Sequence, residues 1–229
     1  MRRASCEPQD RWNQVTDSPA TGGGTGEVVG SGTAAEVLIS AFEIAGRVEE
    51  LGVELREFYA DSPEPPVLIG VLKGSTLFLA DLVRAVGIDA EVDFMAISSY
   101  SASSGQSGVV RIVKDLEGDI AGRDILLVED IVDTGLTLTY LRRSLGEREP
   151  RSLRTVALLD KSARRIVPVP VEFRGFEIPD VFVVGYGLDF MGRYRNVPDL
   201  FAVRDLARLA NDPTLLVEPF FGVDGPPRT

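Results

Sequence analysis

Residues 125–138, ILLVEDIVDTGLTL, hold the side chains whose types and spacing are best suited to chemistry. The apolar run at 125–128 has the length of a buried strand and ends at two adjacent carboxylates, Glu129 and Asp130. Neighbouring residues of a strand point to opposite sides, so both acids can serve one ligand only where the strand gives way to a loop. At such a point each carboxylate can accept a hydrogen bond from one hydroxyl of a cis-diol, as a ribose ring requires.

The turn after this strand has the composition of a phosphate site. It combines small side chains, two threonine hydroxyls and backbone N–H groups at the start of a helix, and it stands at the carboxyl end of a strand, where open parallel sheets bind ligands. Its residues are Asp133, Thr134, Gly135, Leu136 and Thr137. Asp and Thr are also favoured at helix starts as simple caps, but the apolar strand and the acid pair at a fixed offset favour a binding site.

The chain has no histidine and a single cysteine, Cys6, among its 229 residues. The lack of histidine excludes Ser-His-Asp triads, Cys-His pairs and His-ligated metals, so carboxylates, lysine, tyrosine and the backbone remain for chemistry. A single cysteine excludes an intrachain disulfide, and no apolar stretch follows the basic start Met1-Arg2-Arg3 as a signal peptide requires. We therefore expect a cytoplasmic protein.

The net charge of −11 disfavours nonspecific binding to nucleic acid, which needs a basic surface. No apolar run approaches the ~18 residues of a membrane-spanning helix, so we expect no membrane partner either. An anionic substrate must then be held by local features, namely backbone N–H groups, a few lysines and arginines, and metal ions.

Strand-length apolar runs alternate with helical stretches over most of the chain. The spacing predicts an amphipathic helix at 35–59, ended by the proline-rich stretch 61–66, and further helices at about 75–86 and 136–145. Strands are predicted at 67–72, 90–97, 109–113, 124–128, 155–159 and 181–184. This order, with fully apolar strands, predicts an α/β fold in which helices flank both faces of a mainly parallel twisted sheet.

We expect one domain, at residues 35–210. Residues 1–34 are rich in Gly, Ser, Thr and Pro and lack any helical or strand period, which is typical of a disordered leader. The tail, 211–229, is expected to fray. Residues 168–203, together with part of the N-terminal segment, predict a small hood lobe over one edge of the sheet.

The polar stretch 98–107 joins two predicted strands and consists mainly of serine. Long loops of this composition inside compact domains often act as lids over a site. A plain hairpin connection is the alternative.

The segment VEDIVDTG at 128–135 closely resembles the phosphoribosyl pyrophosphate binding motif of type I phosphoribosyltransferases. Its Glu-Asp opening and Asp-Thr-Gly turn are similar to those of the 6-oxopurine branch, the hypoxanthine-guanine phosphoribosyltransferases. Three further segments match that branch in the expected order: residues 71–75 resemble its pyrophosphate loop, Ser99-Tyr100 its flexible catalytic loop, and 175–190 its purine-binding hood. The resemblance spans about residues 38–203 and implies the type I phosphoribosyltransferase fold.

The resemblance implies roles around phosphoribosyl pyrophosphate. Glu129 and Asp130 would bind the ribose hydroxyls and help to organise a Mg²⁺ ion through water. The residues that would hold the 5′-phosphate are Thr134, Gly135, Leu136 and Thr137. Those implied around the pyrophosphate and the metal are Lys73 and Gly74, after a cis peptide at Leu72-Lys73, with Asp189 for a second Mg²⁺ and Arg195 for the leaving group. Ser75 stands where many members have a second glycine.

The resemblance also implies a purine site. Asp133 would take or stabilise the proton at N7 of the base, and Lys161 would donate to the exocyclic O6, which favours 6-oxopurines over adenine. Phe182 would stack on the purine, the backbone of Val183 would contact the ring edge, and Leu188 would shape the pocket. Ser99 and Tyr100 would close over the site. Without the resemblance, Lys73 and Lys161 are ordinary surface cations, Phe182 is a core residue and Asp133 is a helix cap.

The implied activity is purine salvage: transfer of the phosphoribosyl group to hypoxanthine or guanine with Mg²⁺, by a homo-oligomer, a dimer or tetramer. A non-catalytic regulator of the same fold that senses phosphoribosyl pyrophosphate is one alternative, and an enzyme that prefers xanthine is another. Lys161 and the hood disfavour adenine and pyrimidines. A Rossmann-type nucleotide binder is excluded, since no Gly-x-Gly-x-x-Gly follows the first strand.

Overall fold

Two β-sheets organise the part of the chain that this computed structural model describes, residues 34–99 and 110–222. Among these residues, the larger sheet has six strands, in the spatial order β4 (Val110–Lys114), β3 (Glu91–Ser99), β2 (Val67–Leu72), β5 (Asp124–Val132), β6 (Ser152–Asp160) and β7 (Phe173–Glu177). The smaller sheet, over the same residues, consists of β1 (Ala35–Ile39), β9 (Leu200–Val203) and β8 (Phe182–Val184). The helices there are α1 (Ala41–Phe58), α2 (Thr76–Val86), α3 (Leu136–Gly146), α4 (Leu206–Asn211) and α5 (Val217–Phe221).

The larger sheet is mainly parallel, which confirms the predicted α/β fold. β2 pairs in parallel with β3 and β5, and β5, β6 and β7 continue in the same direction. β4 is the exception, since it runs antiparallel to β3. No helix is predicted between these two strands, and an antiparallel pair needs no crossover helix, unlike a parallel pair.

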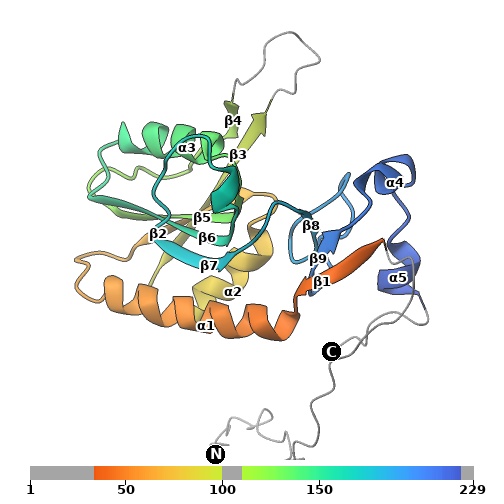
Figure 1. Ribbon diagram of the computed structural model, residues 1–229. Coiled ribbons are helices and arrows are strands. Elements are labelled where there is room, and N and C mark those ends of the chain that lie inside the picture. Colours follow the sequence, from red (N-terminus) through yellow and green to blue (C-terminus); the bar gives the residue numbers. More distant parts are fainter. Residues whose placement is uncertain (1–33, 100–109, 223–229) are drawn as a thin grey trace, which may run out of the picture. The chain divides into compact units, whose positions relative to one another are not determined.

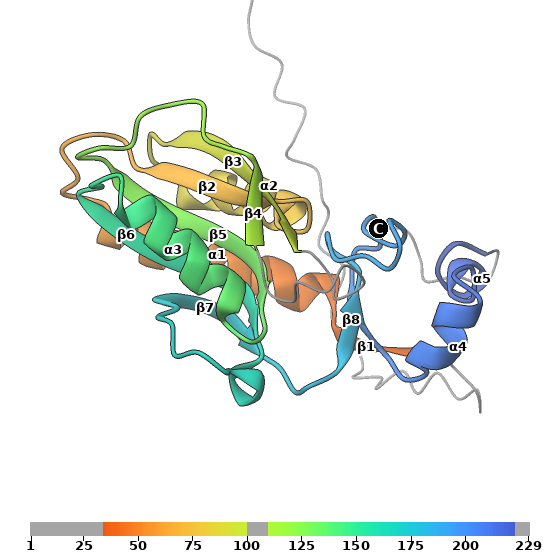
Figure 2. The same ribbon diagram turned by 90° about the horizontal axis from the view of Figure 1, so that it is seen from above.

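Helices cover both faces of this sheet (Figure 1). α1 and α2 pack on one face through the fully buried Leu51, Leu55, Phe78 and Leu82, which belong to one apolar cluster with residues of β2, β5 and β6. α3 packs on the opposite face, where it contributes to a second cluster, and Figure 2 shows the sheet between the two layers. A parallel sheet covered in this way needs apolar residues on both faces, as the sequence predicts.

The order of the strands reverses between β2 and β5. β2 is followed in space by β3 on one side, and by β5, β6 and β7 on the other. The pairing of β2 with β5 ends at Gly70 and Val128, while β2 continues beside β3 to Leu72 and β5 continues beside β6 to Val132. The carboxyl ends of β2 and β5 therefore separate, and such a switch point is where open α/β sheets bind ligands.

The predicted helix at 35–59 is wrong in its first turn and a half. Residues 35–39 form β1, which pairs antiparallel with β9, and α1 begins only at Ala41. Ser40 is the N-cap: its side chain accepts from the Glu43 N–H, and the Glu43 carboxylate accepts from the Ser40 N–H at 2.8 Å. This capping box fixes the helix start, whereas apolar spacing alone extends the helix back through the strand.

The smaller sheet takes β1 from the N-terminal side of the chain and β8 and β9 from the C-terminal side. β7 lies within the 168–203 range predicted for the hood, yet it pairs with β6 in the larger sheet. Residues 1–33, most of the predicted leader, lie outside the described residues. Across the ranges that are described, no helix is long and apolar enough to cross a membrane.

The prediction that the tail frays is wrong for residues 211–222. α5 lies in this stretch, and its Phe220 is 8% exposed, with its ring centroid 4.4 Å from that of Phe201 and 5.7 Å from that of Tyr194. Leu209 and Leu216 are buried in the same cluster. Apolar burial against β9 thus orders a segment whose composition alone predicts no structure.

Candidate active site

A pocket of about 300 Å³ opens where β2 and β5 separate. The predicted site residues that line it are Lys73, Gly74, Glu129, Asp130, Asp133, Thr134, Gly135, Thr137, Asp189 and Arg195. The structure therefore brings together residues from β2, β5, the turn before α3 and the loop between β8 and β9. Apolar residues that were not predicted complete the wall, among them Ile97, Ile131, Val132 and Leu138.

The acid pair lies within β5, which continues to Val132 where the sequence predicted its end at residue 128. Glu129 is paired with β6 through Ala157, and β2 no longer flanks this part of β5. Both acids reach the pocket because β2 separates from β5. β5 itself does not fray at this point. Glu129 is 5% exposed, and the Asp130 Oδ1 accepts from the Ile131 N–H at 2.8 Å.

Burial disfavours the charged forms of both carboxylates. It raises the pKa of Glu129 well above its usual range, with a further contribution from the neighbouring charge of Asp130. Burial likewise raises the pKa of Asp130 to about 6, although backbone N–H groups and Arg195 act in the opposite direction. A cation bound next to both carboxyl groups would stabilise their charged forms.

Carboxylates in such a site suit Mg²⁺. The donors are hard oxygen atoms, and within residues 34–99 and 110–222 no group of three or more His, Cys, Asp or Glu side chains is arranged to hold a metal ion by itself. Mg²⁺ is commonly bound by one or two carboxylates, with water and substrate phosphates as the other ligands. Glu129, Asp130 and Asp189 fit this requirement.

The loop after β2 approaches the acid pair closely. The Leu72-Lys73 peptide is cis, as the resemblance implies. A Cβ on Gly74 would lie 1.5 Å from the Asp130 Oδ2, so this position has no room for a side chain. Ser75, where the resemblance implies a glycine, is fully buried and donates its hydroxyl to the Val71 carbonyl at 2.7 Å, so the serine itself closes the loop.

The turn before α3 depends on a glycine. Gly135 has φ +85° and is the N-cap of α3, and a Cβ there would lie 2.6 Å from the Val167 carbonyl oxygen. The segment behind the turn is held by the Ile166 N–H, which donates to the Thr134 carbonyl at 2.9 Å. Gly135, the N-cap, has no side chain that could cap α3, and Asp133 does not serve as its cap either; the Thr134 Oγ1 accepts from the Leu136 N–H at 3.4 Å. The other N–H groups of the first turn remain available to an anion. The side chain of Leu136 is half exposed and does not line the pocket.

Asp133 belongs to a chain of charges that the sequence did not predict. Its Oδ1 lies 2.9 Å from the Arg164 Nε, and the Arg164 Nη1 lies 2.9 Å from the Asp180 Oδ1. The Lys161 Nζ is 3.9 Å from the same Asp180 oxygen. Lys161 is buried, with 7% exposed, directly after β6, and its N–H donates to the Val132 carbonyl. Nothing in the sequence distinguished Arg164 from the neighbouring cations Lys161 and Arg165.

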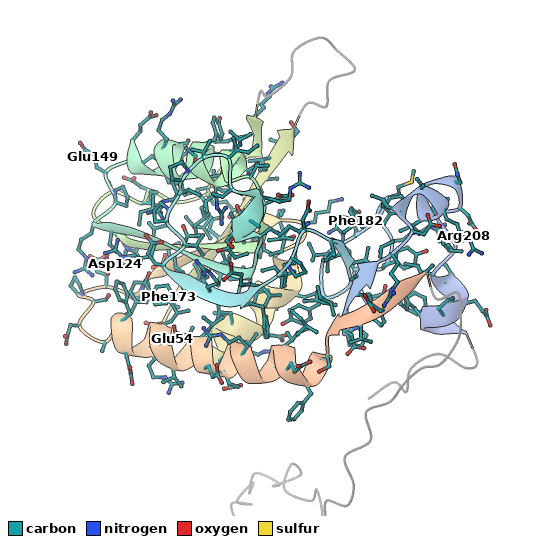
Figure 3. The ribbon with its side chains drawn as sticks, in the orientation of Figure 1. Glu54, Asp124, Glu149, Phe173, Phe182 and Arg208 are labelled. Atoms are coloured by element: carbon teal, nitrogen blue, oxygen red, sulfur yellow. The ribbon has the colours of Figure 1, made fainter. Side chains whose placement is uncertain are left out.

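Of the residues that the resemblance implies for the purine, Asp133 lines the pocket, whereas Lys161, Phe182, Val183 and Leu188 do not. Phe182, labelled at the start of β8 in Figure 3, is half-buried and packs edge to face with Phe190 at 5.8 Å between ring centroids. Val183 and Leu188 are buried in the main apolar cluster. Ser99 is the last residue of β3, and Tyr100 with the rest of the predicted lid lies outside the described residues.

Asp189 and Arg195 lie in the loop between β8 and β9 and line the same pocket as the acid pair. The Arg195 Nη2 lies 2.6 Å from the Asp189 Oδ1. The second oxygen of Asp189 accepts from the Gly192 N–H at 2.6 Å. The pair is about 30% exposed, so both groups remain accessible to a ligand.

Comparison with known proteins agrees with this geometry. The family described as "Phosphoribosyl transferase domain" matches residues 43–191. A hypoxanthine phosphoribosyltransferase of Salmonella typhimurium is 53% identical over 163 residues, which cover 71% of this chain and 92% of that protein. A hypoxanthine-guanine phosphoribosyltransferase of Bacillus subtilis is 50% identical over 163 residues, which cover 71% of this chain and 89% of that protein.

Solved structures give the same result. A hypoxanthine phosphoribosyltransferase from Staphylococcus aureus aligns with a TM-score of 0.70 and 40% identity, covering 74% of this chain and 91% of that one. A hypoxanthine phosphoribosyltransferase from Trypanosoma cruzi also aligns with a TM-score of 0.70 and 40% identity, covering 75% and 96%.

The matched region contains β2, β5 and α3, so the fold around the pocket is that of a phosphoribosyltransferase domain. The chain belongs to the hypoxanthine-guanine phosphoribosyltransferase family of purine-salvage transferases.

Proposed function

We propose that this chain transfers the phosphoribosyl group of phosphoribosyl pyrophosphate to hypoxanthine or guanine, giving IMP or GMP and pyrophosphate. The observation that carries the proposal is the convergence of the acid pair, the glycine turn and the loop after β2 in one pocket at the switch point of the sheet. The three segments match the three parts of the sugar substrate: a diol, a terminal phosphate and a pyrophosphate.

The phosphoribosyl group lies along β5 and the start of α3. Glu129 and Asp130 accept hydrogen bonds from the ribose hydroxyls. The backbone N–H groups of residues 134–137, with the hydroxyls of Thr134 and Thr137, bind the 5′-phosphate, where the dipole of α3 favours negative charge.

The pyrophosphate lies between the loop after β2 and the loop after β8. Lys73 and the backbone of Gly74 hold it on one side, and Arg195 pairs with it on the other. Mg²⁺ would be held by the acid pair and by Asp189, and when bound it supplies charge neutralisation at the leaving group.

In the reaction, a ring nitrogen of the purine bonds to the anomeric carbon while the bond to pyrophosphate breaks and its electron pair leaves with the pyrophosphate. The proton at N7 passes to or is stabilised by Asp133. For this the Arg164 guanidinium must give up part of its contact with Asp133, which is 42% exposed.

Base selection is proposed for Lys161 and the hood. The Lys161 ammonium donates to O6 of a 6-oxopurine and meets an amino group, itself a donor, in adenine. Phe182 stacks on the ring, the backbone of Val183 contacts its edge, and Leu188 shapes the pocket. A lid formed by Ser99 and Tyr100 excludes water from the cationic transition state.

The proposal includes a cytoplasmic location and a homo-oligomer, dimer or tetramer. A groove of about 480 Å³ lined by residues of α1, of α2 and of the loop between β8 and β9, among them Leu77, Tyr186 and Val197, supports an interface between subunits. Light scattering coupled to size-exclusion chromatography measures the mass in solution, and a monomer contradicts this part.

The direct test is a spectrophotometric assay with phosphoribosyl pyrophosphate and each of hypoxanthine, guanine, xanthine and adenine, with and without Mg²⁺. Turnover of hypoxanthine and guanine that requires Mg²⁺ supports the proposal. Binding of phosphoribosyl pyrophosphate without turnover of any base identifies a sensing regulator instead, and fastest turnover of xanthine identifies the other alternative.

A further inference from the structure

The loop between β8 and β9 holds two charged pocket residues on a common backbone support. The Tyr186 N–H donates to the Val197 carbonyl at 2.7 Å and the Gly187 N–H donates to the Arg195 carbonyl at 2.9 Å, which ties the two arms of the loop together. The Arg195 Nη1 donates to the Gly187 carbonyl at 2.6 Å, and its Nη2 pairs with Asp189. The position of Gly187 therefore sets the positions of both charged groups.

Gly187 is in direct contact with the loop after β2. It has φ +97°, and a Cβ built on it would lie 2.1 Å from the Gly74 carbonyl oxygen. The two backbones thus touch, one carrying Lys73 and the other leading to Asp189 and Arg195. Any shift of Gly187 relative to Gly74 changes the distance between the two walls of the pocket.

Tyr186 connects this contact to α2. Its side chain is 8% exposed within the main apolar cluster, and its hydroxyl donates to the Asp81 Oδ2 at 2.5 Å. Asp81 lies in α2, the helix that begins at Thr76, directly after the loop that carries Lys73. Burial raises the pKa of the Tyr186 hydroxyl, so it stays a donor.

The backbone conformation of Tyr186 is unfavourable by itself and is held by the contacts around the residue. Its φ of +41° lies in the left-handed region, which bulky side chains rarely adopt. Such a conformation persists where surrounding contacts determine it. Here the buried ring and the hydroxyl bond to Asp81 supply those contacts, and glycines flank the residue on both sides.

We infer that Tyr186 is a positioning residue, whose hydrogen bond to Asp81 sets Asp189 and Arg195 against Lys73 and Gly74. It acts through Gly187 and touches no substrate. The inference rests on the proposed function, in which these four residues bind the pyrophosphate and its metal. The larger effect is expected on the pyrophosphate side. Of the residues assigned to the purine, only Leu188 lies in the same turn, where it exchanges hydrogen bonds with Gly185, whereas Lys161 and Phe182 belong to other segments.

The test removes each partner separately. Tyr186→Phe deletes the donor and Asp81→Ala the acceptor, and each is expected to raise the KM for phosphoribosyl pyrophosphate about five- to tenfold, with the KM for hypoxanthine within about twofold. Asp81→Asn keeps an acceptor oxygen and is expected to stay near wild type. The double variant Tyr186→Phe/Asp81→Ala is expected to match the single variants in the KM for phosphoribosyl pyrophosphate, since both remove the same hydrogen bond. Asp81 also pairs with Arg84, but that ion pair is exposed and contributes little.

Tyr194→Phe is the matched control. Tyr194 lies in the same loop, is 2% exposed and also has a positive φ, but its hydroxyl donates to the Pro213 carbonyl at 2.5 Å, away from the pocket. It is expected to lower Tm and leave both KM values unchanged. An equal effect of Tyr194→Phe, or a KM for phosphoribosyl pyrophosphate in Tyr186→Phe within twofold of wild type, overturns the inference.

Calorimetric titration with Mg²⁺ and pyrophosphate separates this inference from the proposed function, since it needs no turnover. Weaker pyrophosphate binding by Tyr186→Phe supports the positioning role even if no purine base reacts. Equal binding by wild type and Tyr186→Phe, or none by wild type, overturns it whatever the assay of turnover gives.

Discussion

At the residue scale, the pocket contains more negative than positive charge. Among the described residues that line it, the carboxylates are Glu129, Asp130, Asp133 and Asp189, and the cations are Lys73 and Arg195. Arg195 is already paired with Asp189, and burial raises the pKa of both members of the acid pair. We therefore expect an anionic substrate to enter this site together with metal ions, which is the physical reason for proposing a Mg²⁺ requirement.

Asp133→Asn is expected to lower kcat by about 10²- to 10⁴-fold, because the amide cannot accept the proton from the purine. KM values are expected to change little, since the geometry is retained. Asp180→Asn is the control, because Asp180 shares the Arg164 contact but does not line the pocket. Steady-state kinetics at varied substrate measures both, and an unchanged kcat in Asp133→Asn contradicts the acid-base role.

Gly74→Ala is expected to lower kcat/KM for phosphoribosyl pyrophosphate by about 100-fold, because the new methyl group occupies the place of the Asp130 carboxylate and displaces it. Gly118→Ala is the matched control, since no atom lies within 4 Å of its added Cβ. If both variants retain wild-type kinetics, the close approach of this loop to the acid pair is wrong.

At the scale of elements, the site depends on where strands and helices end. The separation of β2 from β5 after Gly70 opens the pocket, and Gly135 turns the chain into α3, whose first turn offers N–H groups to an anion. The apolar runs of β2, β5 and β6 and the glycine turn were predictable, because a buried parallel strand and a left-handed turn leave strong local signals.

Other element boundaries could not be predicted from the sequence. β5 extends through Glu129 and Asp130 because β6 continues to pair with it, and such a partner is invisible in a local pattern. Residues 35–39 form a strand because β9, more than 160 positions away, supplies the partner. The apolar spacing there fits a helix as well, so only the tertiary pairing decides.

Ser40→Ala is expected to lower the free energy of unfolding by about 1 kcal/mol, through loss of the capping box of α1, and to leave kcat unchanged. Urea denaturation followed by circular dichroism measures the change. Ser40→Thr keeps a capping hydroxyl and serves as the control. A loss of the same size in both variants would show that the cap is not the cause.

At the scale of the whole molecule, segments far apart in the sequence complete the site. The loop between β8 and β9 brings Asp189 and Arg195 to strands that lie some sixty residues earlier, at 129–130. The sequence predicted these residues through the family resemblance alone. The sequence could not predict the contacts of Arg164 with Asp133 and of Tyr186 with Asp81. The residues involved are of common types and lie at no characteristic spacing.

Phe220→Ala is expected to lower the free energy of unfolding by about 3 kcal/mol, because it leaves a cavity among Tyr194, Phe201 and the small sheet. Phe221→Ala, at a half-buried neighbouring position, is expected to cost less than half as much. Chemical denaturation of both variants tests whether α5 belongs to the folded core, and equal losses contradict that.

The central claim is that the acid pair of β5 and the turn before α3 bind a sugar that carries a terminal phosphate. Crystals soaked with IMP measure it directly. The phosphate is expected at the N–H groups of residues 134–137, and the ribose hydroxyls at Glu129 and Asp130. A vacant turn, with the nucleotide bound at another place on the protein, would contradict it.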